Sequence, residues 1–237
     1  MRINSLVDAE ELKKEVVTLS PAESHHLARV LRIADGQEIV LFDGQGNVAD
    51  AVVESVSKSA VVVRVIRRSQ IPPPAVQIDL IQAVPKLDRW DLVMQKAVEL
   101  GVSNIRPILT QHTECKPNDK RTARWQKIVL NAAQQCEVRW LPVLHPLVPM
   151  EETLPQLADY DLALVGSLYE GAKPFHEVSF AGKRKVALLV GPEGDFTPEE
   201  VTAAVQAGAI PVSFGARILR TETAAIFGLS VLAYELL

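Results

Sequence analysis

The chain has 237 residues, of which 48% are hydrophobic and 23% are charged, which is the composition of a globular protein with one or two domains. Its formal net charge of −4 excludes proteins such as histones, which hold nucleic acid by bulk positive charge, but leaves room for a local basic patch. With two cysteines, Cys115 and Cys136, it can form neither a disulfide framework nor a four-cysteine zinc site.

The first 70 residues are expected to form a small β-rich domain. Ser20-Pro21-Ala22-Glu23 has the pattern of a helix start, with an N-cap, a proline in the first turn and a carboxylate, and predicts a helix through His25–Leu31. Three short runs rich in β-branched residues follow and predict a meander or a small barrel: Gln37–Phe42, Val48–Ser55 and Ala60–Ile66.

Three consecutive prolines, Pro72–Pro74, end this segment and predict a linker around residues 71–74. Beyond it, strands alternate with helices, which is the pattern of an α/β fold with a parallel sheet covered on both faces. The expected strands are Val76–Val84, Val102–Leu109, Leu162–Gly166, Val186–Val190 and Ile210–Phe214. The expected helices are Arg89–Leu100, Asp119–Cys136, Glu151–Leu157, Thr197–Ala207 and Glu222–Leu237. We therefore expect two domains, residues 1–70 and 71–237.

The strand that ends at Val190 runs directly into Gly191-Pro192-Glu193-Gly194-Asp195. Ligands of open parallel sheets bind beyond the carboxyl ends of the strands, and two glycines around a rigid Pro-Glu pair let backbone amides approach a ligand closely. The loop has neither Walker nor dinucleotide-binding spacing. On spacing alone, a turn with a purely structural role is the simpler interpretation.

A second group of polar residues follows the strand that ends at Phe214. Two arginines, two threonines and a carboxylate occur close together here: Arg217, Arg220, Thr221, Glu222 and Thr223. A helix start accounts for Thr221 as a cap and for Glu222 as a partner of the helix dipole. It does not account for Arg220, because a cation in the first turn opposes the dipole. Arg220 is therefore a candidate functional residue.

Leu189-Val-Gly-Pro-Glu-Gly194, followed by Gly215-Ala-Arg-Ile-Leu-Arg-Thr-Glu-Thr-Ala224, resembles the ribosomal RNA small-subunit methyltransferase E family, of the SPOUT class of knotted methyltransferases. The resemblance continues, in the expected order, in His26–Arg32, Phe42–Gly44, Lys86 with Gln95–Gly101, and Gln134-Gln135. The chain departs from the family pattern at three places. Asp195 stands where the family usually has glycine, Val138 where it commonly has arginine (Arg139 is adjacent), and Glu114-Cys115-Lys116 replaces a Glu-Arg-Ser-like segment.

The resemblance implies a PUA-like N-terminal β-barrel that binds RNA and a C-terminal α/β domain with a deep trefoil knot. It also implies S-adenosylmethionine (SAM) as methyl donor and N3 of a uridine in small-subunit ribosomal RNA as acceptor, within an assembled or nearly assembled subunit. Enzymes of this kind are usually homodimers, here through Ala224–Leu237. Because no signal peptide or membrane span is visible, we expect a cytoplasmic protein.

The resemblance further assigns residues to roles. Uridine N3 must lose a proton before it can attack, so Arg220 is the candidate that stabilises the resulting anion, and Glu222 is a base, an orienter of Arg220 or only a helix cap. The implied cofactor-binding residues are Leu164, Gly166, Leu189, Val190, Gly191, Pro192, Glu193, Gly194, Gly215, Ile218, Leu219 and Thr223. The candidate RNA-binding residues are His25, Arg29, Arg32, Arg67 and Arg139. No metal is expected, since the five histidines are scattered.

Two basic clusters could contact phosphate, or could equally be solvated charged faces. The first cluster, in the small domain, consists of Arg29, Arg32, Arg64, Arg67 and Arg68. The second consists of Lys116, Lys120, Arg121, Arg124 and Lys127. Two further functions stay open beside SAM-dependent methylation of small-subunit RNA. One is a non-catalytic RNA-binding factor for ribosome assembly, and the other is a methyltransferase of the same fold that acts on another RNA.

Overall fold

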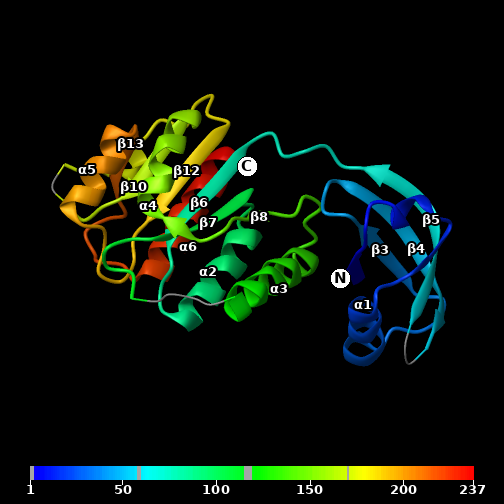
Figure 1. Cartoon of the computed structure of the whole chain (residues 1–237). Coiled ribbons are helices and arrows are strands. Elements are labelled where there is room, and N and C mark those ends of the chain that lie inside the picture. Colours follow the sequence, from blue (N-terminus) through cyan, green and yellow to red (C-terminus); the bar gives the residue numbers. More distant parts are fainter. Residues whose placement is uncertain (1–2, 58–59, 115–118, 170) are drawn as a thin grey trace. The chain divides into compact units, whose positions relative to one another are not determined.

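The computed structural model describes residues 3–57, 60–114, 119–169 and 171–237 (Figure 1). The chain divides into two compact units. The first comprises Met1–Pro74 and Ala133–Leu141, and the second Ala75–Ala132 and Pro142–Leu237. The polyproline segment carries no helix or strand. Residues 133–141, which lie far along the chain in the expected second domain, belong with the first unit.

The first unit contains a five-stranded sheet in the order β1-β3-β4-β5-β2. Its strands are β1 Ile3–Leu6, β2 Val16–Thr18, β3 Glu38–Phe42, β4 Asn47–Val56 and β5 Val61–Gln70. The expected meander is confirmed, because β3, β4 and β5 pair antiparallel in sequence order. The expected closed barrel is not found. Closure requires the end strands to pair, and β1 and β2, which are four and three residues long, make no such pairing in the described part of the chain.

One helical segment covers this sheet and begins as the sequence predicts. The Ser20 side chain accepts a hydrogen bond from the Glu23 N–H at 3.3 Å, and α1 (Pro21–His25) continues as a wider, π-type turn over His26–Leu31. Leu27 is fully buried in this turn. A short 3-10 turn, Glu11–Lys13, joins β1 to β2.

The second unit is built on one sheet in the order β11-β13-β10-β12-β6-β7-β8, with β9 also paired to β7. All these pairings are parallel, so the predicted parallel sheet is confirmed. The strands are β6 Gln77–Ala83, β7 Asn104–Leu109, β8 Val143–Leu144, β9 Val148–Pro149, β10 Leu162–Gly166, β11 Lys173–Pro174, β12 Lys185–Val190 and β13 Ala209–Ser213. The central strands are buried on both faces, which explains their continuous apolar runs.

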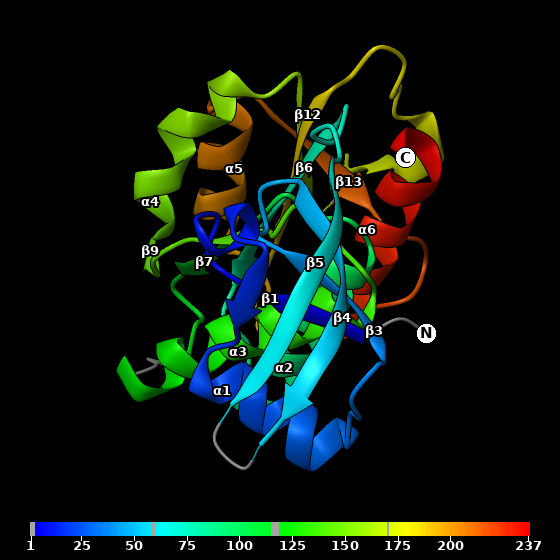
Figure 2. The same cartoon turned by 90° about the vertical axis from the view of Figure 1, so that its right-hand side faces the viewer.

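Helices cover both faces of this sheet: α2 Leu87–Glu99, α3 Asp119–Gln135, α4 Met150–Thr153, α5 Pro198–Gln206 and α6 Thr221–Leu236, with 3-10 turns at Leu154–Asp159 and Phe175–Glu177. Figure 2 shows α4 and α5 on one face and α6 on the other. Thr197 caps α5 in a full capping box with Glu200, as its sequence pattern predicts. Among the described helices, none is long and apolar enough to cross a membrane.

Candidate active site

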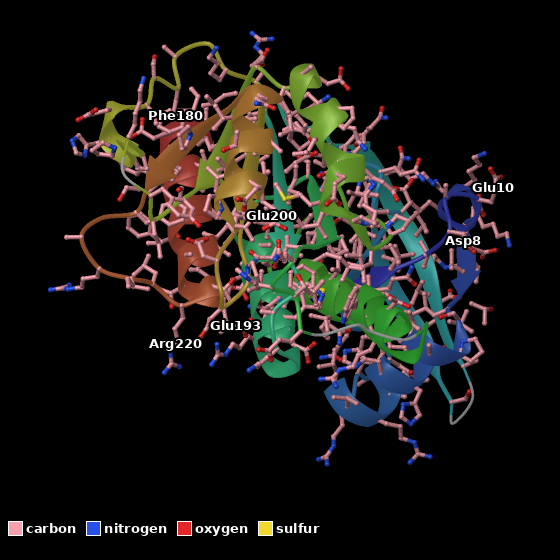
Figure 3. The ribbon with its side chains drawn as sticks, turned by 60° about the vertical axis from the view of Figure 1, so that its left-hand side comes forward. Asp8, Glu10, Phe180, Glu193, Glu200 and Arg220 are labelled. Atoms are coloured by element: carbon pink, nitrogen blue, oxygen red, sulfur yellow. The ribbon has the colours of Figure 1, made fainter. Side chains whose placement is uncertain are left out.

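A cavity of about 280 Å³ lies beyond the carboxyl ends of three neighbouring strands. Its walls come from the segments that follow β10, β12 and β13, and from the first turns of α2 and α6. Ligands are expected at this edge of a parallel sheet. Figure 3 shows Glu193 and Arg220, both from these segments, near each other at one end of the unit.

The structure brings most of the predicted cofactor residues together around this cavity. Those that line it are Gly166, Val190, Gly191, Pro192, Glu193, Gly215, Ile218 and Leu219. The other four are not among the lining residues. Leu164 and Leu189 are fully buried in the sheet, whereas Gly194 lies against the His112 ring and Thr223 is exposed on α6.

Gly166 is needed where β10 meets the cavity wall. A Cβ atom at this position would lie 2.9 Å from Cε2 of Phe214, closer than carbon atoms approach. Phe214 cannot simply turn away, because its ring packs against Phe175 and Phe227 with centroid distances of 5.5 and 5.8 Å. The absent side chain therefore keeps the ring of Phe214 in the wall of the cavity.

Thr221 has a different role from the one that the sequence suggested. The N-cap of α6 is Arg220, and the Thr221 hydroxyl instead donates a 2.6 Å hydrogen bond to the carbonyl oxygen of Gly191. Gln82, at the end of β6, donates to the Thr221 hydroxyl at 2.9 Å. Both side chains are buried. Sequence reasoning missed Gln82, a fully buried amide at the carboxyl end of a strand.

Arg89 was also missed, although it stands in the first turn of α2 and lines the cavity. Its Nη1 atom lies 3.4 Å from Glu193 Oε1 and 3.8 Å from Glu222 Oε2. Glu193 Oε1 also accepts a 3.0 Å hydrogen bond from the backbone N–H of Lys86, the N-cap of α2. Glu193 thus caps a helix from a distant segment, which no local pattern at residue 86 could reveal.

The two arginines after β13 differ from Arg89 in their surroundings. Arg217 and Arg220 line the cavity and are exposed. Within the described part of the chain, neither side chain has a hydrogen bond or an ion pair. Arg220 therefore offers an uncompensated guanidinium at the cavity, whereas Glu222, 12% exposed, faces Arg89.

Asp195 adopts a left-handed backbone conformation, with a φ of +58°. Its Oδ1 atom accepts a 2.8 Å hydrogen bond from the N–H of Phe196, and the N–H of Leu168 also bonds to the carboxylate. Burial raises the pKa of Asp195, and these two N–H groups partly offset the rise. The carboxylate thereby links the loops after β10 and β12, beside the cavity.

His112, in the segment after β7, contacts the loop after β12. Its Nδ1 atom lies 3.0 Å from the carbonyl oxygens of both Gly194 and Asp195. Because both neighbours are acceptors, we assign the ring hydrogen to Nδ1. Segments after three parallel strands therefore meet at Asp195.

Comparisons with known proteins agree with this architecture. The family model "RNA methyltransferase domain" matches residues 72–233, and "RNA methyltransferase PUA domain" matches residues 19–66. A ribosomal RNA small subunit methyltransferase E of Mycobacterium bovis is 33% identical, over 90% of this chain and 84% of that protein. The chain belongs to the ribosomal RNA small subunit methyltransferase E family. The resemblance stated from the motifs is thus confirmed.

Three other known proteins are similar to this chain along nearly its whole length. The protein of Synechocystis is 30% identical, over 94% of this chain and 75% of that protein. A methyltransferase of Legionella pneumophila, solved with the cofactor SAM, has a TM-score of 0.90 at 33% identity and covers 99% of this chain and 98% of its own. The methyltransferase E of Neisseria gonorrhoeae, bound to SAM, has a TM-score of 0.90 at 29% identity, with coverage of 99% and 98%.

In this family member, the RNA-binding candidates of the first unit divide into two groups. His25, Arg29 and Arg32 are exposed, and none of their side chains has a partner among the described residues. Arg67 instead pairs with Asp50 at 2.7 Å. Arg64 and Arg68 are engaged as well, the former with Glu54 and the latter with the carbonyl oxygens of Leu12 and Lys14.

Arg139, another RNA-binding candidate, is largely buried and not exposed as a phosphate contact would be. Its side chain is only 16% exposed, and the guanidinium carbon lies 5.5 Å from the centre of the Phe42 ring. Nη2 lies 3.7 Å from Glu137 Oε2. The backbone of Arg139 is held as well, because the N–H of Gly46 donates to its carbonyl oxygen at 3.0 Å. Arg139 therefore packs against the sheet of the first unit.

Part of the second basic cluster lies outside the described residues, namely Lys116 and the side chains of Lys120 and Arg121, and so does Cys115. Of the remaining members, Arg124 pairs with Asp91 and Lys127 is exposed. The Sγ atom of Cys136 lies 4.0 Å from the carbonyl oxygen of Ala133. Across the described ranges, no group of three histidine, cysteine or acidic side chains could hold a metal ion.

Proposed function

We propose that this protein transfers the methyl group of SAM to N3 of a uridine in small-subunit ribosomal RNA. The observation that carries the proposal is the cavity at the carboxyl edge of the parallel sheet, with the uncompensated Arg220 in its wall. The SAM-bound relatives, which align with nearly the whole chain, support the choice of cofactor. The names of the curated relatives support small-subunit RNA as substrate.

The lining of the cavity fits SAM chemically. An adenosine needs apolar walls and backbone groups within reach, and Val190, Pro192, Phe214 and Leu219 supply the walls. Gly166 keeps the wall open, because a Cβ there would displace Phe214. The amino-acid part of SAM carries both charge signs, and the lining offers carboxylates and guanidiniums to match: Glu193, Asp195, Arg89, Arg217 and Arg220. We assign cofactor binding to the eight predicted residues that line this cavity.

When bound, SAM supplies a methyl group activated by the adjacent sulfonium. The protein has to hold the uracil in line with that group and to stabilise the negative charge that develops as the N3 proton leaves. The guanidinium of Arg220 is always charged and offers forked donors to a uracil oxygen. Glu222 is the second candidate, as acceptor of the N3 proton or as a group that orients a neighbouring arginine.

RNA docking is assigned to the first unit. His25 and Arg29 lie on the helical segment of this unit and Arg32 at its C-terminal end; all three are exposed, have no side-chain partner among the described residues, and are the proposed phosphate contacts. Arg67 and Arg139 are weaker candidates, since each already has a carboxylate partner. The proposed acceptor lies in an assembled or nearly assembled small subunit, which places the reaction in the cytoplasm.

Two further features belong to the proposal. The first is a homodimer through α6, whose exposed Phe227 and Tyr234 are apolar surface suited to a second subunit. The second is a deep trefoil knot formed by the segments after β12 and β13. The hydrogen bond from Thr221 to Gly191 supports it, because it joins these two segments at the cavity.

The experiment incubates the protein and labelled SAM with small subunits that lack the modification, then maps the methylated nucleoside. Label at N3 of a uridine in the subunit RNA is expected. Label only in transfer RNA would overturn the substrate, and SAM binding without transfer to any RNA would favour an assembly factor. R220A should lose transfer and keep SAM binding, whereas a fully active R220A protein would remove Arg220 from the mechanism.

A further inference from the structure

We propose that Arg89 is a positioning residue, which ties the loop after β12 to the first turn of α6 through Glu193 and Glu222 and so holds Arg220 at the cavity. The inference rests on the proposed function. It adds a residue from α2, a helix that none of the predicted cofactor or catalytic residues occupies.

The first tie runs from Arg89 to the loop after β12. Glu193 Oε1 receives the N–H of Lys86 at 3.0 Å and faces Arg89 Nη1 at 3.4 Å. The first turn of α2 thus offers this carboxylate one backbone donor and one charged donor. Charge-assisted bonds of this kind are stronger than neutral ones. We therefore expect Glu193 to hold the loop that starts at Gly191 against α2.

The second tie runs from Arg89 to α6. Glu222 is 12% exposed, and its Oε2 atom is buried without a hydrogen-bond partner in the described structure. The cation that faces it is Arg89, at 3.8 Å. A buried carboxylate that loses its compensating charge is costly, so the first turn of α6 is expected to move if Arg89 is removed.

Such a movement would reach Arg220. Arg220 is the N-cap of α6 and stands two residues before Glu222. Its own side chain has no partner in the described residues, so its direction depends on where the first turn of α6 lies. Misplacement of a charged group by about 1 Å can cost a hundredfold in rate. Arg89 therefore acts on the reaction through Arg220.

The same helix contains a matched control. Lys96 pairs with Glu99 at 2.8 Å, one turn apart on α2, and neither residue lines the cavity. Exposed pairs of this kind contribute little. K96A removes a cation and an ion pair from α2 without touching the proposed ties.

The test is a double-mutant cycle on methyl transfer to unmodified small subunits, with R89A, E222Q and the pair. R89A and E222Q are each expected to lower kcat at least about tenfold, and the double variant is expected to be no worse than R89A by more than about twofold. R89K should recover part of the rate, and K96A should equal the wild type. Additive losses, or full activity of R89A, would overturn the inference.

A second cycle, on the dissociation constant for SAM measured by calorimetry, uses R89A and E193Q and needs no RNA. Each single variant is expected to weaken SAM binding about threefold or more, and the double variant to match R89A. If the effects of R89A and E193Q on the dissociation constant add independently, Arg89 does not hold the cofactor loop through Glu193. If the wild type binds SAM with this coupling but methylates no small subunit, the proposed function fails, while the tie from Arg89 to Glu193 in the cofactor loop stands. If R89A unfolds, the cycles are run with R89Q.

Discussion

The hydroxyl of Thr221 donates a 2.6 Å hydrogen bond to the carbonyl oxygen of Gly191, which joins the first turn of α6 to the loop after β12. Gln82 completes this contact from β6, with its amide 2.9 Å from the Thr221 hydroxyl. Three segments that are far apart in the sequence therefore meet in one buried polar group. Because buried polar atoms are costly when they lose a partner, the contact holds both cofactor loops in place.

Replacing Thr221 with valine removes the hydroxyl but keeps the shape of the side chain. We expect T221V to lower the free energy of unfolding by about 1–3 kcal/mol, because the Gly191 carbonyl and the Gln82 amide each lose their shortest hydrogen bond. SAM binding should weaken together with stability. Thermal unfolding and calorimetric titration measure the two effects, and T221S, which keeps the hydroxyl, is the control. If T221V matches T221S in both measurements, the hydrogen bond has no role in the site.

Gly166→Ala tests the packing at the end of β10. The new Cβ would lie 2.9 Å from the Phe214 ring, which cannot move freely. Overpacking of this kind costs about 1–3 kcal/mol, and the displaced ring should reduce the space for SAM. We expect G166A to bind SAM more weakly, and G166A with Phe214→Leu to recover part of the affinity. A G166A protein with unchanged affinity would show that the ring does not limit the cavity.

Asp195 predicts a dependence of stability on pH. Burial raises its pKa above the ordinary 3.8, so the folded state disfavours the ionised carboxylate. Its contribution to stability is therefore greatest below pH 3.8 and falls as the pH rises through the raised value. Asparagine keeps an acceptor oxygen, tolerates the φ of +58° and does not ionise.

The melting temperature of D195N, relative to the wild type, should therefore rise between pH 3.5 and pH 7. The rise should be about 2–4 °C for each kcal/mol of stability that the wild type loses when Asp195 ionises. D195A serves for comparison. It loses the bond to Phe196 and strains the left-handed backbone, so it should be less stable at every pH. A constant difference between D195N and the wild type would contradict the raised pKa.

Tyr160 predicts a loss of stability without a loss of cofactor binding. Burial and a 2.5 Å hydrogen bond to Asp79 raise the pKa of Tyr160, so its hydroxyl stays a donor to that fully buried carboxylate. Y160F should cost about 1–3 kcal/mol. Its affinity for SAM should stay unchanged, because Tyr160 does not line the cavity. A melting temperature of Y160F equal to that of the wild type would show that the bond to Asp79 does not stabilise the fold.

The exposed arginines of the first unit predict how RNA binding depends on salt. Arg29 and Arg32 have no carboxylate partner in the described structure, whereas Arg67 is paired with Asp50 at 2.7 Å. The double variant R29A/R32A should weaken binding to small-subunit RNA and reduce the slope of log affinity against log salt by about 2. R67A should change the slope less. If the slope of R29A/R32A equals that of the wild type, these arginines do not bind phosphate.

Much of the second unit was predictable from local patterns. The strand Leu162–Gly166 was predicted at its observed ends, and Thr197 and Pro198 marked the start of α5. Strands buried on both faces carry uninterrupted apolar runs, and capping residues satisfy the first N–H groups of a helix. The very short strands were not predicted, among them β1, β2 and β8. Two to four residues carry too little pattern to be seen without their pairing partners.

The sequence by itself determined the α/β alternation, the loop at Gly191 and the arginine at Arg220, since each depends on neighbouring residues along the chain. The tertiary structure alone decided that Glu193 caps α2, that Thr221 bonds to Gly191 and that Arg89 faces Glu222. The structure also has an open sheet in the first unit, where a barrel was expected, and residues 133–141 belong to that unit. These contacts join residues 30 or more positions apart. Which residues come into contact depends on how the strands and helices pack, and the spacing of residues along the chain does not show this.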